Sequence, residues 1–111
     1  MQITNTEVSG AVVLSISGSV DATTVAEFDD EWKKTFDEGT KKLVVDLSGI
    51  EYMSSAGLRG ILMLAKTAKA KGVAVAFCGM NGMVADIFKL SGFLSILAVY
   101  PDVETAAGAL Q

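Results

Sequence analysis

The stretch Leu43–Leu58, with the sequence LVVDLSGIEYMSSAGL, decides how this chain folds. Its first residues form an apolar run, which is typical of a strand in the middle of a parallel sheet. A short loop is expected to follow, and Ser54 and Ser55 then open a helix. Hydroxyls at a helix start lie beside unpaired backbone N–H groups and the positive end of the helix dipole. They are therefore suited both to capping the helix and to carrying a phosphate.

On both sides of this stretch, strand patterns alternate with helical patterns. Alternating or continuous apolar residues predict strands over 3–8, 11–17, 41–47 and 73–78, with a further short strand over 94–99. Apolar residues at helical spacing predict helices over 21–38, 54–71 and 81–90. A terminal helix is expected after Pro101, with Asp102 as its cap. This order of elements predicts an α/β fold.

The first two predicted strands form an antiparallel hairpin through the turn at Ser9 and Gly10. The remaining strands alternate with helices, which favours a mostly parallel sheet. We therefore expect one α/β domain over residues 1–111, with an N-terminal antiparallel hairpin and about four helices. The outward face of the second strand is only half apolar, so helices should cover one face of the sheet better than the other. This face carries Ala11, Val13, Ser15 and Ser17.

Composition excludes several classes of function. The chain has no histidine and one cysteine, which argues against zinc sites and histidine-based catalytic triads. A net charge of −4 argues against binding to nucleic acid or to an anionic membrane. No nucleotide-binding glycine motif occurs, so we expect neither a cofactor nor a metal. The lone Cys78 lies in an apolar strand and is expected to be a small buried thiol.

Localisation signals are also lacking in the sequence. The longest uncharged runs fall short of the ~20 residues that a membrane-spanning helix needs. The first residues lack the basic start and apolar centre of a signal peptide. We therefore expect a cytoplasmic protein.

The predicted helices over 21–38 and 54–71 carry opposite charge. The first holds seven acidic residues against two lysines, and the second holds four basic residues and no acid. One interpretation is a pair of solvated helix faces, and the other is a basic partner surface beside the two serines. The first is favoured, because runs of charge usually belong to solvated faces. Trp32 falls on the apolar stripe of the first helix with Phe28 and Phe36 and is expected in the core.

The block Val44–Leu58 resembles the signature of STAS domains, the anti-sigma factor antagonists. In that family a strand leads through a loop to D/S-S-x-G-L at the start of the second helix. Gly18-Ser19-Val20-Asp21 resembles the family's G-x-x-D before the first helix, and residues 88–93 (FKLSGF) resemble its L-T-G-L-like segment after the third. The resemblance covers essentially the whole chain and implies a STAS-like fold.

The resemblance implies a regulatory switch in a bacterial cytoplasm. Its partner would be an anti-sigma factor that is also a serine kinase, and a PP2C-type phosphatase would reverse the phosphorylation. The phosphorylated serine of the family falls on Ser55, and the residue before it, often aspartate in the family, is Ser54 here. The implied partner-binding residues are Asp21, Ser54, Ser55, Gly57 and Leu58. Some relatives act instead as scaffolds in stress signalling.

The residues themselves leave alternatives open. Ser54 is suited to be an N-cap, worth ~1 kcal/mol, and Asp21 to cap the first helix. Gly57 and Gly60 either leave the helix bare for a partner's backbone or ease packing against the sheet. Three functions therefore compete: a switch controlled by phosphorylation, a scaffold without phosphorylation, and a serine enzyme.

The enzyme hypothesis fails for lack of a histidine base. The lysines that would have to replace it, Lys66 and Lys69, lie ~16–21 Å along the helix from the serines.

Overall fold

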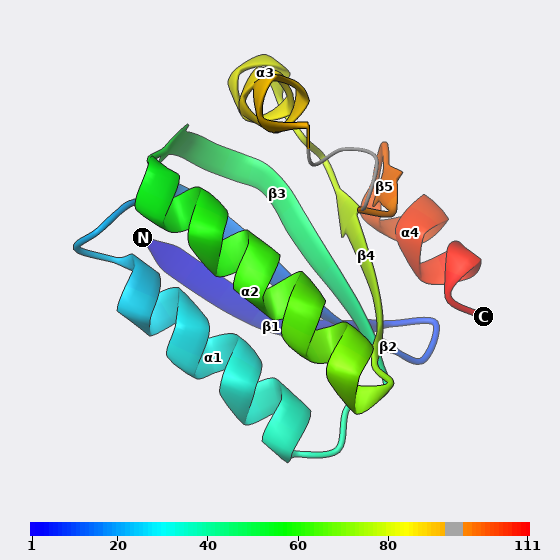
Figure 1. Cartoon of the computed structure of the whole chain (residues 1–111). Helices are drawn as coiled ribbons and strands as arrows, with labels where there is room; N and C mark the ends of the chain where they lie inside the picture. The colour runs from blue at the N-terminus through cyan, green and yellow to red at the C-terminus, as the bar shows by residue number, and fades with distance from the viewer. Residues whose placement is uncertain (93–96) are drawn as a thin grey trace.

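The computed structural model describes residues 1–92 and 97–111 (Figure 1). The strands are β1 (Gln2–Val8), β2 (Ala11–Val20), β3 (Lys42–Met53), β4 (Ala74–Cys78) and β5 (Val99–Tyr100). The helices are α1 (Val25–Asp37), α2 (Ser55–Lys71), α3 (Gly82–Ser91) and α4 (Val103–Ala109). The predicted alternation of strands and helices is confirmed, and Asp102 caps α4 as expected.

The strands form one sheet in the order β1-β2-β3-β4-β5. β1 pairs with β2 antiparallel, and the other neighbouring strands pair in parallel. The hairpin turns through Ser9 and Gly10, both with positive φ, which is the conformation of tight two-residue hairpin turns. The predicted sheet, mostly parallel with an antiparallel hairpin at its start, is therefore confirmed.

The two faces of the sheet are covered differently (Figure 1). Helices α1 and α2 lie side by side over one face, and the larger core lies between them and the sheet. Helix α4 covers part of the other face, where small side chains of β2, β3 and β4 meet Ala106 and Ala107. Trp32 is buried and its ring lies 5.4 Å from that of Phe36, which confirms its predicted place in the core.

Strand β3 is longer than the sequence analysis predicts. The expected strand ends at Leu47 and the expected loop follows, but β3 continues to Met53. Its second half is held by the second half of β2, with Ser17 opposite Gly49 and Val20 opposite Met53. A Cβ on Gly49 would lie 2.8 Å from the Cβ of Ser17, so the absence of a side chain at this position permits the close pairing of β2 and β3. From the sequence alone, this segment is expected to form a loop.

The end of the chain is described only in part. Three residues of the predicted strand over 94–99, residues 94–96, lie outside the described residues, as does Phe93 of the family-like segment. The described strand in this region is β5, which begins at Val99 and pairs with β4.

The opposite charges of α1 and α2 produce little direct contact. Among the described residues there is one ion pair, in which the Lys71 ammonium lies 3.8 Å from the Asp37 carboxylate. Both side chains are exposed, so the pair contributes little to stability. This favours the interpretation of these charges as solvated helix faces.

We predict opposite effects for two glycine-to-alanine substitutions in helices. Gly57→Ala should lower the free energy of unfolding by about 1–3 kcal/mol, because its Cβ would lie 2.3 Å from the Val20 carbonyl oxygen. Gly108→Ala is the control and should raise it by up to about 1 kcal/mol, because no atom lies within 4 Å of its Cβ. Urea unfolding of both variants measures this. Equal stability of the two variants would contradict the close contact between α2 and β2.

Candidate functional site

Two separate sequence segments meet where β2 ends and α2 begins. The backbone N–H of Ser54 donates to the Val20 carbonyl at 3.0 Å. Val20 also lies opposite Met53 in the β2–β3 register. The structure thus brings the segment 18–21 against the segment 53–58, the two places where family-like motifs occur.

The two serines have different local roles. Ser54 is the N-cap of α2, with extended backbone, and its hydroxyl accepts a hydrogen bond from the Gly57 N–H at 3.4 Å. Ser55 is the first residue of the helix, and its side chain is exposed. The capping role predicted for Ser54 is therefore confirmed, and the hydroxyl of Ser55 remains accessible to another protein.

The start of α2 is electrostatically suited to an anion. Within the described residues, the backbone N–H groups of Ser55 and Ala56 have no hydrogen-bond acceptor. The first turn holds no acidic residue, and Arg59 is exposed one turn further along. Side chains four residues apart lie on the same face of a helix, so Arg59 is within reach of a group carried by Ser55.

The glycines of α2 serve packing within the chain. Gly57 is buried against the Val20 carbonyl, and a Cβ on Gly60 would meet the Val25 side chain at 2.7 Å. Both lie on the inward face of the helix. The alternative in which these glycines leave the surface bare for a partner's backbone is therefore wrong, and Gly57 acts by letting α2 begin close to β2.

Asp21 does not cap α1, contrary to prediction. The helix begins later, at Val25, and its N-cap is Thr24. The Asp21 carboxylate instead accepts hydrogen bonds from the Thr23 hydroxyl at 2.7 Å and from the Thr23 N–H at 2.9 Å. These bonds lower the pKa of the Asp21 carboxyl, so it is ionised at neutral pH. A turn between Val20 and α1 thus places a fixed negative charge directly after the strand end that contacts α2.

Leu58 and Tyr52 flank the serines with different exposure. Leu58 is half-buried and packs against the larger core. Tyr52 has an exposed fraction of 51%, an unusual exposure for a large aromatic side chain. Tyr52 is not among the predicted site residues, because residues 48–53 were expected to form a loop. The available signal was an aromatic residue in a polar segment, two positions before Ser54.

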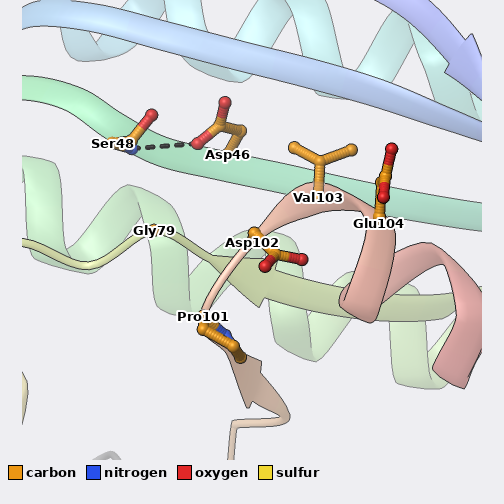
Figure 2. A pocket seen from close by; sticks show the side chains of 7 residues that line it. All are labelled: Asp46, Ser48, Gly79, Pro101, Asp102, Val103 and Glu104. Atoms are coloured by element: carbon orange, nitrogen blue, oxygen red, sulfur yellow. Dashed lines mark hydrogen bonds between the residues drawn. The ribbon is translucent and has the colours of Figure 1, made fainter.

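A second candidate region is a cavity of about 460 Å³ beside the middle of β3 and just after the end of β4 (Figure 2). Its lining residues are Asp46, Ser48, Gly79, Pro101, Asp102, Val103 and Glu104. The carboxylate of Asp46 accepts hydrogen bonds from the Ser48 N–H and from the Ser15 hydroxyl. Asp102 accepts one from the Thr105 N–H, as the cap of α4. Two of its three carboxylates therefore have structural partners, and the hydrogen bond between Ser48 and Asp46 uses the backbone N–H of Ser48 and not its hydroxyl.

Cys78 lies buried beneath the same region. Burial raises the pKa of its thiol to about 12, and the nearby Asp46 and Asp102 carboxylates add to this. The expectation of a small buried thiol is confirmed. In the described part of the chain no cluster of residues is suited to hold a metal ion. Nor does any described helix combine the length and hydropathy needed to cross a bilayer.

The chain is similar to STAS-domain proteins in both sequence and structure. The family model of the STAS domain matches residues 2–106. A putative anti-sigma factor antagonist of Bordetella bronchiseptica, BtrV, is 32% identical over 100% of this chain and 96% of its own length. The structure resembles an anti-sigma factor antagonist of Mycobacterium paratuberculosis with a TM-score of 0.90, at 21% identity over 98% of this chain and 92% of that one. It also resembles phosphorylated SpoIIAA of Bacillus, with a TM-score of 0.75, at 14% identity over 99% of this chain and 100% of that one.

We predict that Cys78 makes stability depend on alkaline pH. The folded thiol has a pKa of about 12 against an ordinary value of 9.0, so the unfolded chain loses this proton first. The contribution of the neutral thiol is complete below pH 9 and declines as the pH rises from 9 towards 12, by at most ~1.4 kcal/mol per pH unit. Urea unfolding between pH 8 and 11 should show a flatter decline for Cys78→Ala. Identical slopes for the two proteins would contradict the burial of the thiol.

Proposed function

The chain belongs to the STAS-domain family, and on that premise we propose that it is an anti-sigma factor antagonist controlled by phosphorylation of Ser55. It binds an anti-sigma factor that is also a serine kinase, in a bacterial cytoplasm, and thereby frees a sigma factor for transcription. The kinase phosphorylates Ser55 and ends the interaction, and a PP2C-type phosphatase restores it. The protein acts by binding and is not itself an enzyme.

The observation that carries this proposal is the separation of roles between the two serines. Ser54 uses its hydroxyl to cap α2, whereas the Ser55 hydroxyl is exposed at the first helical position. A kinase needs a hydroxyl that reaches its active site, and a phosphatase needs the same access to the phosphate. Modification of Ser55 also leaves the cap intact, so the helix start keeps its geometry in both states.

The helix start is suited to hold the phosphate without loss of the fold. Phosphorylation adds about −1.5 to −2 charge and three acceptor oxygens at pH 7. The free N–H groups of Ser55 and Ala56 and the positive end of the dipole favour such a group. Arg59 adds a cation one turn away. The phosphate therefore acts on the interface with the partner and not on stability.

The interface is proposed to surround Ser55. Ser54, Leu58 and the ionised Asp21 belong to it, and Gly57 holds α2 close to the end of β2. The exposed Tyr52 supplies an aromatic contact, a type of residue that often anchors protein interfaces. A neutral hydroxyl at the centre becomes a doubly charged group that must lose its hydration when the partner binds. That penalty amounts to several kcal/mol and is enough to separate the complex.

The relatives support this function at a coarser level. BtrV, similar over the whole chain, is described as a putative anti-sigma factor antagonist. SpoIIAA, which shares the fold, has been solved in a phosphorylated form. The net charge of −4 also agrees with a protein partner in preference to nucleic acid.

We predict that Ser55→Asp weakens binding to the serine-kinase anti-sigma factor by at least about a hundredfold with little change in melting temperature, because the charge acts at the interface. Ser55→Ala should bind like the native protein and never be switched off. Calorimetric titration with candidate kinases, followed by incubation with ATP and mapping of the phosphate by mass spectrometry, tests both statements.

Ser54→Ala is the matched control. It removes the cap and should lower stability by ~1 kcal/mol while phosphorylation at Ser55 continues. A phosphate mapped to Ser54, or native affinity of Ser55→Asp, would contradict the mechanism. Tight binding without any phosphorylation would favour the scaffold, which is the alternative function.

We also predict a role for Arg59 in the phosphorylated state. Arg59 follows Ser55 by four residues on α2, so both side chains lie on the same face of the helix. Its guanidinium should therefore favour the dianionic form of the phosphate. Phosphorus NMR should therefore give a lower titration midpoint for the native phosphoprotein than for the Arg59→Gln variant. Equal midpoints would mean that Arg59 does not contact the phosphate.

A further inference from the structure

Strand β1 forms one edge of the sheet, and within the described residues no strand pairs with its outer side. β1 contributes seven residues and pairs with β2 alone, whereas the other edge strand, β5, has two residues. A short edge strand offers few free backbone groups to another chain, and a long one offers many. β1 is therefore the edge at which an added strand finds the most hydrogen-bonding partners.

The hairpin turn determines which backbone groups of β1 face outward. Val8 and Ala11 pair directly across the two-residue turn, so they form a hydrogen-bonded pair. Hydrogen-bonded pairs then recur at every second residue of β1, at Thr6, Thr4 and Gln2. The N–H and C=O groups of the alternate residues, Ile3, Asn5 and Glu7, consequently point away from β2. None of them has another hydrogen-bond partner in the described part of the chain.

β1 lacks the features that usually protect an edge strand. It holds no proline and no lysine, and Glu7 is its single charged residue. Its register with β2 runs from Gln2 to Val8 without interruption, so no bulge twists the edge away. The edge is thus open and regular over its full length.

The surface beside this edge is acidic. A cavity of about 430 Å³ lies between the start of β1 and helix α1, lined by Met1, Gln2, Ile3, Thr4, Glu27 and Glu31. The two side chains of α1 in this lining are both glutamates, one turn apart. Successive side chains of an added strand alternate between the two faces of the sheet. Those on the α1 face would pass over the glutamates.

We propose that the β1 edge binds an extended segment of a partner protein that carries lysine or arginine at alternate positions. The segment pairs with the outward groups of Ile3, Asn5 and Glu7 as a sixth strand, and its basic side chains lie along Glu27 and Glu31. Main-chain hydrogen bonds supply affinity in this binding mode, and the alternate side chains supply specificity. This surface includes none of the residues assigned to the Ser55 switch.

A second copy of the chain is a poorer occupant. Two-fold pairing of β1 with β1 would extend both α1 helices along the same face of a joined sheet. The glutamates beside each edge would then face a partner edge of the same charge, which disfavours the pairing. The acidic border therefore selects a basic strand over a copy of itself.

The experiment uses two peptides with the alternating sequence (Val-Lys)₅, one native and one N-methylated at every second backbone amide. Amide hydrogen exchange by NMR should show at least tenfold protection of Ile3, Asn5 and Glu7 by the first peptide and none by the second. Thr4 and Thr6 are internal controls, because their amides already bond to β2. In the Glu27→Gln/Glu31→Gln variant the peptide affinity should fall at least tenfold while the melting temperature changes little.

Three results would overturn the proposal. The first is an absence of protection at Ile3, Asn5 and Glu7. The second is equal protection by (Val-Glu)₅, which would show that the acidic border has no role. The third is dimerisation of the native chain through β1 in sedimentation experiments without peptide, because the edge would then be occupied by a second copy.

Discussion

The candidate functional site depends on one close contact between backbones, the approach of helix α2 to the end of strand β2. The Val20 carbonyl accepts the Ser54 N–H at 3.0 Å, and the same carbonyl leaves no space for a side chain at position 57. Because Gly57 has none, α2 begins directly against the sheet. Ser54 then closes the helix start, and Ser55 is left at the surface. The glycine and the serines of the motif thus differ in their structural roles: Gly57 determines where the helix lies, Ser54 caps it, and Ser55 is exposed at its first position.

Most of the fold follows from local patterns in the sequence. Apolar runs and helical spacing predict the strands and helices, and the tight turn at Ser9 and Gly10 predicts the hairpin. The predictions differ from the structure where contacts between distant parts of the chain determine the backbone conformation. β3 passes through Ser48 and Gly49 because β2 lies beside it, and no local pattern in a polar segment shows that. The sequence predicts Asp21 as a helix cap, yet the helix begins at Val25, after a turn in which Thr23 donates hydrogen bonds to the Asp21 carboxylate.

The candidate site was predictable to a similar degree. The positions of Ser54 and Ser55 at a helix start follow from the sequence, because a helical pattern begins there after a polar segment. The burial of Gly57 and Gly60 does not, since the residues they contact, Val20 and Val25, belong to another part of the chain. Likewise, the exposure of Tyr52 does not follow from the sequence, because it depends on the extension of β3 to Met53.

The two proposed surfaces of this protein favour partner groups of opposite charge. At the start of α2 the helix dipole and Arg59 favour an anion, which suits the reversible phosphorylation proposed for Ser55. Along β1 and the first turns of α1 the glutamates favour a cation, which suits a basic strand. Phosphate on Ser55 changes the charge at its own surface but leaves the hydrogen bonds between β1 and β2 unaltered. A partner bound along β1 would therefore stay attached in both states of the switch, and the domain would hold one protein while it releases another.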